Sequence, residues 1–418
     1  MKKLIILLIV ACSLHTSAQQ SFRPATSAAA AGFSAERLQR IDSFYNEMVK
    51  KGDVPNAVTF IARNGQIVHH KAYGFSNLEK QIPAKTSDIF RIASQTKLIT
   101  TIAMMMLYEE GKFLLDDPID KYLPEFRNVQ VLVSYDKTTH KLETRAPKSR
   151  PTIRQLLSHT AGIPYEMALD SQLVGNITDL GKLLDMSTEA VVKELAKRPL
   201  AHDPGEHFTY GYNIDVAGRI VEVLSGKLLN DFFQERIFQP LGMNDTYFYL
   251  PSAKYSRLVE LYSKRDAGQP ITVSTDQANR DFATGDKRRV HMGGEGLVST
   301  ASDYAKICQL ILNGGEFNNK RLLSRKTVAL MSRNQIGNNE VWDRHDKFGL
   351  GFQLITGNTT YADQASVGSL TWGGAYCSEY TIDPTEKLVM LVFTNIYPYT
   401  YYGEFVRKFR ILTYQALQ

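Results

Sequence analysis

The run from Leu98 to Leu107 most constrains how this chain can fold. It carries no charged residue and places isoleucine, methionine and alanine on every side of a helix. A helix that is apolar on every side must be buried all round. The fold must therefore surround this segment with other elements, and 418 residues with 43% apolar side chains are enough to build such a core.

Strand patterns occur near both ends of the chain. Residues 58–62 and 66–70 flank Asn64-Gly65, and Asn-Gly between two β-rich runs is a strong short-range signal for a hairpin. Near the C-terminus, strand patterns return at residues 349–355, 376–382 and 388–394. We expect one antiparallel sheet assembled from the two ends of the chain.

Helical patterns dominate the rest of the chain. Ser34 is a candidate N-cap for a helix, and the middle is helical apart from a β-rich stretch at residues 129–142. Further helical patterns occupy residues 152–158, 188–197, 214–224 and 302–312. The fold class is therefore α/β (α+β), an antiparallel sheet flanked by helices on both faces with an inserted, mostly helical lobe. We expect the sheet lobe at about residues 33–93 plus 290–418 and the helical lobe at about residues 94–289.

The first 18 residues have the layout of a cleavable secretory signal. Two lysines precede a short apolar run, residues 4–10, and small and polar residues follow up to Ala18. The run is too short to span a bilayer, so we expect no membrane span and a periplasmic or secreted protein. The alternative is a lipoprotein, because residues 9–12 resemble a lipidation site that would leave the chain anchored through Cys12.

Charge and composition exclude several kinds of partner. The 49 basic and 43 acidic residues are mixed along the chain, and no basic run is interleaved with aromatic residues, so we expect no nucleic-acid partner. The histidines are scattered, and Cys308 and Cys377 are too few for a disulfide scaffold and have no metal-ligand spacing. We expect two separate thiols, no metal and no cofactor, and the oligomeric state stays open.

The pattern Ser-x-x-Lys occurs twice, as Ser94-Gln95-Thr96-Lys97 and as Ser134-Tyr135-Asp136-Lys137. Such a short motif is weak, and only its context can choose between the copies. Ser94 opens the buried helix, whereas Ser134 lies in a strand and turn with no helix after it. Ser94 is therefore the candidate nucleophile, and Lys137 is a solvated turn residue.

Ser94 and Lys97 can cooperate chemically. Because they lie three residues apart on one helix, their side chains share a face and their ends can meet. The partial positive charge at a helix N-terminus favours an alkoxide, and an apolar wall disfavours an ammonium ion. A neutral Lys97 can then take the hydroxyl proton, so that Ser94 attacks an ester or amide carbonyl.

At these residues the chain resembles the serine β-lactamase and penicillin-binding-protein family, in its class C β-lactamase and family VIII esterase branch. Further stretches that carry the resemblance lie at residues 115–118, 156–163, 240–243 and 293–300. The resemblance covers most of the mature chain. It implies the β-lactamase/transpeptidase-like fold, with the active site in the cleft between the two lobes.

The second motif of the family is Tyr-x-Asn, and it follows a Pro-Gly pair. Here Pro204-Gly205 precedes both Tyr210 and Tyr212, so two registers are open. Counting back from residues 215–218 places Tyr210 at the catalytic position and Tyr212 where lactamases carry asparagine. A tyrosine paired with Lys97 can pass a proton to the leaving group and later activate water.

The third motif of the family is Lys-Thr-Gly, and its counterpart here is Trp372-Gly373-Gly374. Trp372 offers an aromatic wall and one N–H donor in place of the positive charge of the lysine. The two glycines let a substrate backbone approach the strand closely. The resemblance also implies that the backbone N–H groups of Ser94 and Ala375 form the oxyanion hole.

Tyr212 in place of asparagine and Trp372 in place of lysine both depart from the lactamase motifs. They favour an esterase-like hydrolase that acts on a small-molecule ester, amide or lactam through an acyl-enzyme on Ser94. The alternatives are a β-lactamase, a D-alanyl-D-alanine peptidase, and an acyl-binding sensor without turnover. The peptidase needs a cationic anchor for its substrate carboxylate, and the nearest cluster is Lys287-Arg288-Arg289. The predicted site comprises catalytic Ser94, Lys97 and Tyr210, oxyanion-hole Ser94 and Ala375, and substrate-binding Tyr212, Trp372, Gly373 and Gly374.

Overall fold

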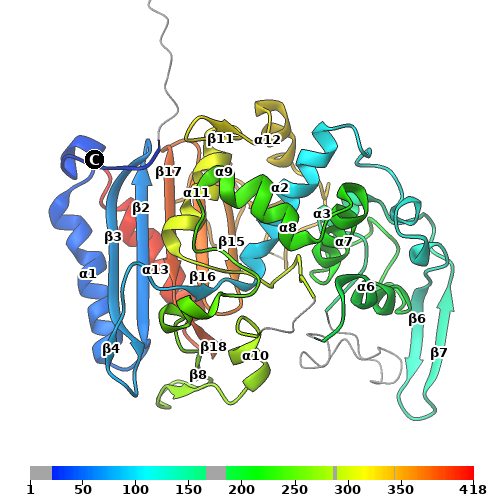
Figure 1. Cartoon of the computed structure of the whole chain (residues 1–418), viewed down its shortest axis with the longest axis horizontal. Helices are drawn as coiled ribbons and strands as arrows, with labels where there is room; N and C mark the ends of the chain where they lie inside the picture. Colours follow the sequence, from blue (N-terminus) through cyan, green and yellow to red (C-terminus); the bar gives the residue numbers. More distant parts are fainter. Residues whose placement is uncertain (1–20, 166–184, 286–289, 343) are drawn as a thin grey trace, which may run out of the picture.

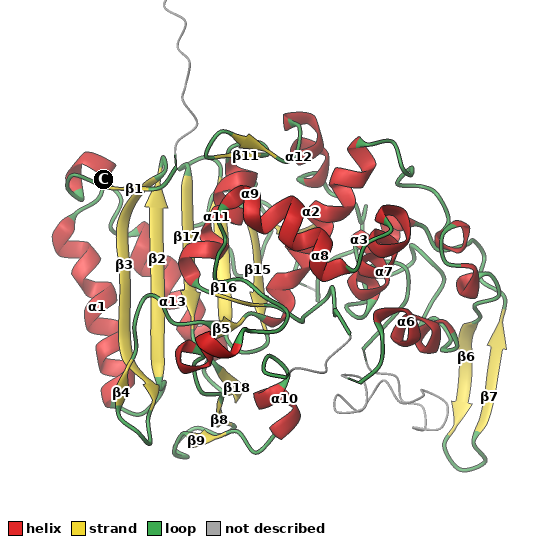
Figure 2. Cartoon of the chain, in the orientation of Figure 1, coloured by secondary structure: helices red, strands yellow, loops and turns green. Residues whose placement is uncertain are grey.

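The computed structural model describes residues 21–165, 185–285, 290–342 and 344–418. It has the predicted mixed α/β fold, in which helices cover a central sheet (Figures 1 and 2). Within these ranges no helix is both long enough and apolar enough to cross a membrane. The predicted signal at residues 1–18, Cys12 and the basic run 287–289 lie outside the described residues.

The main sheet is built from the two ends of the chain, as predicted. Its order is β1-β3-β2-β17-β16-β15-β14-β13, and β4 pairs with β3. The strands are β1 (Arg23–Pro24), β2 (Asn56–Arg63), β3 (Gln66–Asn77), β4 (Ile82–Pro83), β13 (Lys347–Phe348), β14 (Gln353–Leu354), β15 (Leu370–Gly374), β16 (Ser378–Asp383) and β17 (Leu388–Phe393). The neighbouring pairs are antiparallel except at one edge, where the short β1 runs parallel to β3.

Strands β2 and β17 join the two halves of the sheet at its centre, with Val58 opposite Phe393 and Phe60 opposite Leu391. Their side chains alternate between two hydrophobic cores. Phe60 and Leu391 belong to one core, and Ile61 and Met390 belong to the other. Because both faces of these strands are buried, their sequences are apolar at almost every position.

Helices pack on both faces of the sheet (Figure 1). Helices α1 and α13 lie on one face, and α11 lies on the other, against β2, β16 and β17. The helices are α1 (Ala35–Lys50), α2 (Thr96–Glu109), α3 (Ile153–Leu157), α6 (Thr188–Ala196), α7 (Asn213–Ser225), α8 (Leu229–Phe233), α9 (Gln239–Leu241), α10 (Gln277–Asp281), α11 (Ala301–Leu312), α12 (Arg325–Met331) and α13 (Tyr402–Tyr414). Ser34 caps α1 by accepting a hydrogen bond from the N–H of Arg37, as its position predicts.

Short strands complete the fold. They are β5 (Phe90–Arg91) with β10 (Val298–Ser299), β6 (Val131–Asp136) with β7 (Lys141–Arg145), β8 (Tyr262–Lys264) with β9 (Thr272–Val273) and β18 (Ile396–Tyr399), and β11 (Glu316–Phe317) with β12 (Lys320–Arg321). The hairpin β6–β7 accounts for the β-rich stretch predicted at residues 129–142. It lies at the end of the molecule away from the main sheet (Figure 2).

The predicted strand at residues 349–355 is wrong in extent. Only Gln353–Leu354 forms a strand, β14, which pairs with β13 in a short hairpin. Gly351 interrupts the strand with a φ angle of 86°, and its N–H donates to the carbonyl of Leu157 at 3.1 Å. A contact with Leu157, which is distant in the sequence, therefore sets this turn. The local sequence pattern does not reveal such a contact.

Candidate active site

Ser94 lies where the chain enters the central helix. It belongs to a short 3₁₀ turn, Ala93–Gln95, between β5 and α2. Every residue from Thr96 to Leu107 is buried, which confirms that the run is surrounded on all sides. Ala93, just before the serine, has a φ angle of 42°, a conformation that costs energy for a residue with a Cβ. Strain of this kind is frequent beside catalytic groups.

Lys97 lies one turn further along, with 1% of its surface exposed. Its Nζ donates to three oxygens, those of the Ser94 hydroxyl at 3.3 Å, the Tyr165 hydroxyl at 2.8 Å and the Gly294 carbonyl at 2.7 Å. The three partners surround the amine and direct it toward the serine. The predicted meeting of the Ser94 and Lys97 side chains is thus present.

Two tyrosines flank Lys97, and the sequence analysis missed one of them. Tyr165 contacts the amine through its hydroxyl, whereas Tyr210 presents its ring, with its centroid 4.7 Å from Nζ. The Tyr210 hydroxyl instead accepts a hydrogen bond from Nε1 of Trp372 at 3.3 Å. Burial raises the pKa of Tyr165 well above its usual value, so this phenol stays protonated.

The local fold explains why both tyrosines reach the lysine. Gly211 packs so tightly against Ile163 and Pro164 that a Cβ there would overlap them. The side-chain amide of Asn213 donates to the carbonyl of Ile163 at 3.1 Å. These contacts fasten the loop before α7 to the segment 163–165, so that the rings of Tyr165 and Tyr210 lie 5.4 Å apart.

Tyr212, which we expected to bind substrate, is 9% exposed and packs edge-on against Tyr165, with the ring centroids 4.6 Å apart. The guanidinium of Arg198 lies over its ring, 5.9 Å from the centroid. Within the described residues, Tyr212 does not line the cavity that opens beside Ser94. A substrate-binding role for Tyr212 stays a prediction.

The carboxyl groups of Asp215 and Glu295 lie near Lys97. Burial and the nearby charge of Glu295 together raise the pKa of Asp215 to about 7, although the charge of Lys97 acts against them. Oδ1 of Asp215 accepts a hydrogen bond from the N–H of Gly294 at 2.8 Å, while the carbonyl of Gly294 accepts from Lys97. A Cβ at Gly294 would collide with the Asp215 carboxyl group. Gly294 therefore connects the two side chains, because its N–H binds Asp215 and its carbonyl binds the amine of Lys97.

The motif Trp372-Gly373-Gly374 forms the end of β15, beside the turn that carries Ser94. Its two glycines allow other groups of the protein to lie close to the β15 backbone. A Cβ at Gly373 would collide with the Tyr402 hydroxyl, and one at Gly374 would collide with the Ile92 carbonyl. Glycine at 374 thus lets β15 pack directly against the backbone leading to Ser94.

The proposed oxyanion hole has available donors. Neither the N–H of Ser94 nor that of Ala375 donates a backbone hydrogen bond to a described residue. Both residues line the cavity that opens beside Ser94. Their N–H groups are therefore available to an oxyanion that forms in this cavity.

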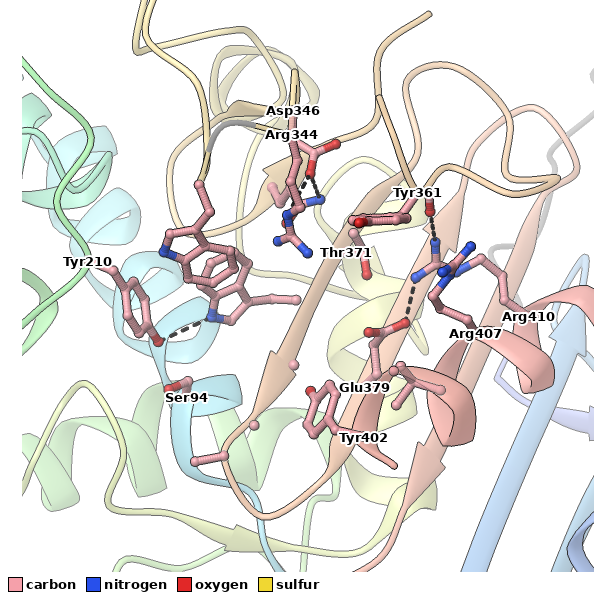
Figure 3. Close-up of a pocket in the computed structure, with 18 residues that line it drawn as sticks. Ser94, Tyr210, Arg344, Asp346, Tyr361, Thr371, Glu379, Tyr402, Arg407 and Arg410 are labelled. Atoms are coloured by element: carbon pink, nitrogen blue, oxygen red, sulfur yellow. Dashed lines mark hydrogen bonds and ion pairs between the residues drawn. The ribbon is translucent and has the colours of Figure 1, made fainter. Parts of the chain in front are cut away.

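The cavity that opens beside Ser94 has a volume of about 330 Å³ (Figure 3). On one side it has an aromatic wall, in which Trp342 stacks on Trp372 with ring centroids 5.2 Å apart and Tyr210 packs against both. On the other side it has charged residues from β16, α13 and the loop before β13. Its lining comprises Ser94, Tyr210, Trp342, Arg344, Asp346, Gln353, Tyr361, Thr371, Trp372, Gly373, Gly374, Ala375, Glu379, Tyr402, Gly403, Val406, Arg407 and Arg410.

The second Ser-x-x-Lys motif lies outside this arrangement, as predicted. Ser134 is on β6, and its hydroxyl donates to Glu143 on the neighbouring β7 at 3.0 Å. Cys308 and Cys377 are two separate, buried thiols. Within the described ranges, no cluster of three or more His, Cys, Asp or Glu residues has the arrangement of a metal site.

The fold, with its Ser-x-x-Lys site, is that of the serine hydrolases and acyltransferases with a β-lactamase/transpeptidase-like architecture. The family model described as Beta-lactamase matches residues 41–413. The chain therefore belongs to the beta-lactamase family.

Its relatives include named esterases and a synthase. Esterase EstB of Burkholderia gladioli is 27% identical over 383 residues, which cover 87% of this chain and 91% of that protein. Lovastatin esterase of Penicillium rubens is 31% identical over 304 residues, which cover 71% of this chain and 73% of that protein. Among solved structures, simvastatin synthase (LovD) of Aspergillus terreus superposes with a TM-score of 0.77 at 25% identity, covering 91% of this chain and 98% of that one.

Proposed function

We propose that this chain is a secreted, esterase-like serine hydrolase that forms an acyl-enzyme on Ser94. The observation that carries the proposal is the contact between the Ser94 hydroxyl and the buried amine of Lys97 at 3.3 Å. A serine with an adjacent base at the mouth of a cavity has the arrangement of an activated nucleophile. The named esterases among the relatives support the same reaction class.

In the proposed reaction the hydrogen bond between Ser94 and Lys97 reverses its direction, so that the hydroxyl gives its proton to the amine as Ser94 attacks the carbonyl carbon. The N–H groups of Ser94 and Ala375 hold the oxyanion. Tyr210 lines the cavity, so its hydroxyl can give a proton to the departing alcohol. Tyr165 holds Lys97 in place through the 2.8 Å contact. Water then attacks the acyl-enzyme by the same route in reverse and frees the acid.

Trp372 favours an ester over a lactam or a cell-wall peptide. Where lactamases have a lysine, this chain has an indole that donates to Tyr210 and stacks on Trp342. The position therefore supplies an aromatic wall and no positive charge for a lactam carboxylate.

Kinetics of the mature protein on 4-nitrophenyl butyrate and on nitrocefin test this proposal. We expect sustained release of nitrophenol and little nitrocefin cleavage. Faster turnover of nitrocefin than of the ester would identify a β-lactamase. A burst of one equivalent without a steady state would identify an acyl-binding sensor, because deacylation would then be negligible.

The two tyrosines are expected to differ in their contributions. Tyr210→Phe removes the proton donor that faces the substrate and should lower kcat/KM by about 100-fold. Tyr165→Phe removes one partner of Lys97 and should lower kcat/KM by roughly tenfold and shift its pH profile. Tyr247→Phe is the control, since its hydroxyl donates to the carbonyl of Asn244 outside the cavity. Wild-type activity of Tyr210→Phe would remove Tyr210 from the mechanism.

A further inference from the structure

Three arginines line the cavity at the side away from Tyr210: Arg344 from the loop before β13, and Arg407 and Arg410 from α13 (Figure 3). Because three cations share one cavity with the nucleophile, the partners of each arginine decide which of them is available to a substrate. The carboxylates that face them are Asp346, Asp363 and Glu379.

The two arginines on α13 are neutralised within the protein. Arg407 binds Asp363 through Nε at 3.1 Å and Nη2 at 2.6 Å. Arg410 donates through Nη2 to Glu379 at 2.6 Å and through Nη1 to the carbonyl of Tyr361 at 3.1 Å. These contacts engage two N–H donors of each guanidinium and bring each charge within hydrogen-bond distance of a carboxylate.

Arg344 is bound much more loosely. Its nearest carboxylate oxygen is Oδ2 of Asp346, 3.8 Å from Nε, which is too far for a hydrogen bond. That same oxygen accepts a hydrogen bond from the amide of Gln353 at 2.7 Å. Within the described residues, the guanidinium of Arg344 makes no hydrogen bond, although its Nε is buried. Arg344 therefore keeps unused donors.

Two aromatic rings hold this guanidinium over the cavity. Its carbon lies 4.8 Å from the ring of Trp342 and 5.9 Å from that of Tyr361. The side chain extends toward the interior of the cavity near Thr371 (Figure 3). Stacking on aromatic faces leaves the edge of the guanidinium, where its N–H donors lie, free for a planar anion.

We propose that Arg344 binds a carboxylate group of the substrate, so that the enzyme acts on esters that carry a negative charge. This inference rests on the proposed function, because it names the substrate class of the same site. The carboxylate accepts two N–H donors of the guanidinium, while the scissile carbonyl lies at Ser94 and Ala375. The anion displaces no hydrogen bond of the Arg344 guanidinium to any residue that the structure describes.

The carboxylate can belong to the alcohol or to the acyl part of the ester, and two pairs of substrates distinguish these sources. 4-Acetoxybenzoate and its methyl ester differ only by a charge on the leaving group. 4-Nitrophenyl hydrogen adipate and 4-nitrophenyl methyl adipate differ only by a charge on the acyl chain. The readout is the ratio of kcat/KM for the charged and the neutral member, corrected for spontaneous hydrolysis.

The variants are Arg344→Gln and, as a matched control, Arg407→Gln, which removes the same charge from a paired arginine of the same cavity. We expect Arg344→Gln to lower the ratio at least roughly tenfold in one pair through KM, and Arg407→Gln to leave it nearly unchanged. Arg344→Lys should keep part of the ratio, because it restores the charge without the fork.

Hydrolysis of the neutral esters by Arg344→Gln at the wild-type rate shows that the variant is folded and the Ser94 chemistry intact. An unchanged ratio in both pairs, or an equal fall in Arg407→Gln, would overturn the assignment to Arg344. Failure of the wild type to hydrolyse any of the four esters would instead overturn the proposed function.

Discussion

Ser94→Ala is expected to abolish ester hydrolysis, with a fall in kcat of at least about 10⁴-fold, because no other group can form the acyl-enzyme. The effect should be purely chemical. Ser94 is only half-buried, and Lys97 keeps its contacts with Tyr165 and Gly294 when the serine hydroxyl is removed. The thermal unfolding temperature should therefore stay within a few degrees of that of the wild type. The activity loss is measured with 4-nitrophenyl butyrate.

The second Ser-x-x-Lys motif provides a matched control for this variant. Ser134→Ala removes an identical hydroxyl from an identical local pattern, but on the β6–β7 hairpin outside the cavity. We expect it to be fully active. A fluorophosphonate probe should label the wild type and Ser134→Ala once each and leave Ser94→Ala unlabelled, as mass spectrometry would show. Labelling of Ser94→Ala would mean that another serine is the nucleophile.

The sheet and the central helix could be predicted because their patterns are local. The Asn64-Gly65 turn fixes the β2–β3 hairpin, and full burial of α2 follows from its lack of charge. The segment at residues 349–355 could not be predicted in the same way. Its apolar residues suit a strand, but Gly351 bonds to the distant Leu157 and turns the chain. A contact across the fold outweighs local propensity there.

The same distinction between local patterns and distant contacts holds for the residues of the candidate site. Ser94 and Lys97 are neighbours on one turn, so sequence spacing alone brings them together. Tyr165 reaches Lys97 only because Gly211 and Asn213 fasten two loops that are far apart in the chain. The segment that carries Tyr165 begins directly after Gly162-Ile163, which the family resemblance already marks. A tyrosine there is a signal that could have been used.

Lys97→Met is expected to lower kcat/KM by about 10³- to 10⁴-fold, because it removes the base from Ser94. Methionine has a similar length and shape and suits a buried site, so the helix should keep its packing. The substitution leaves the Gly294 carbonyl and the Tyr165 hydroxyl without their partner, and we expect about 1–3 kcal/mol of lost stability. Thermal unfolding measures this loss, and ester kinetics measure the chemistry.

Lys137→Met is the matched control, since Lys137 occupies the same place in the second motif, and it should change neither quantity. The pH dependence adds a readout that a merely structural role of Lys97 would not change. If Lys97 accepts the serine proton, Lys97→Met should change the pH dependence of kcat/KM, and the residual activity of the variant should increase only with hydroxide. A variant that is folded, nearly as active as the wild type and unchanged in pH profile would show that Lys97 only fills space beneath Ser94, and that another group accepts the serine proton.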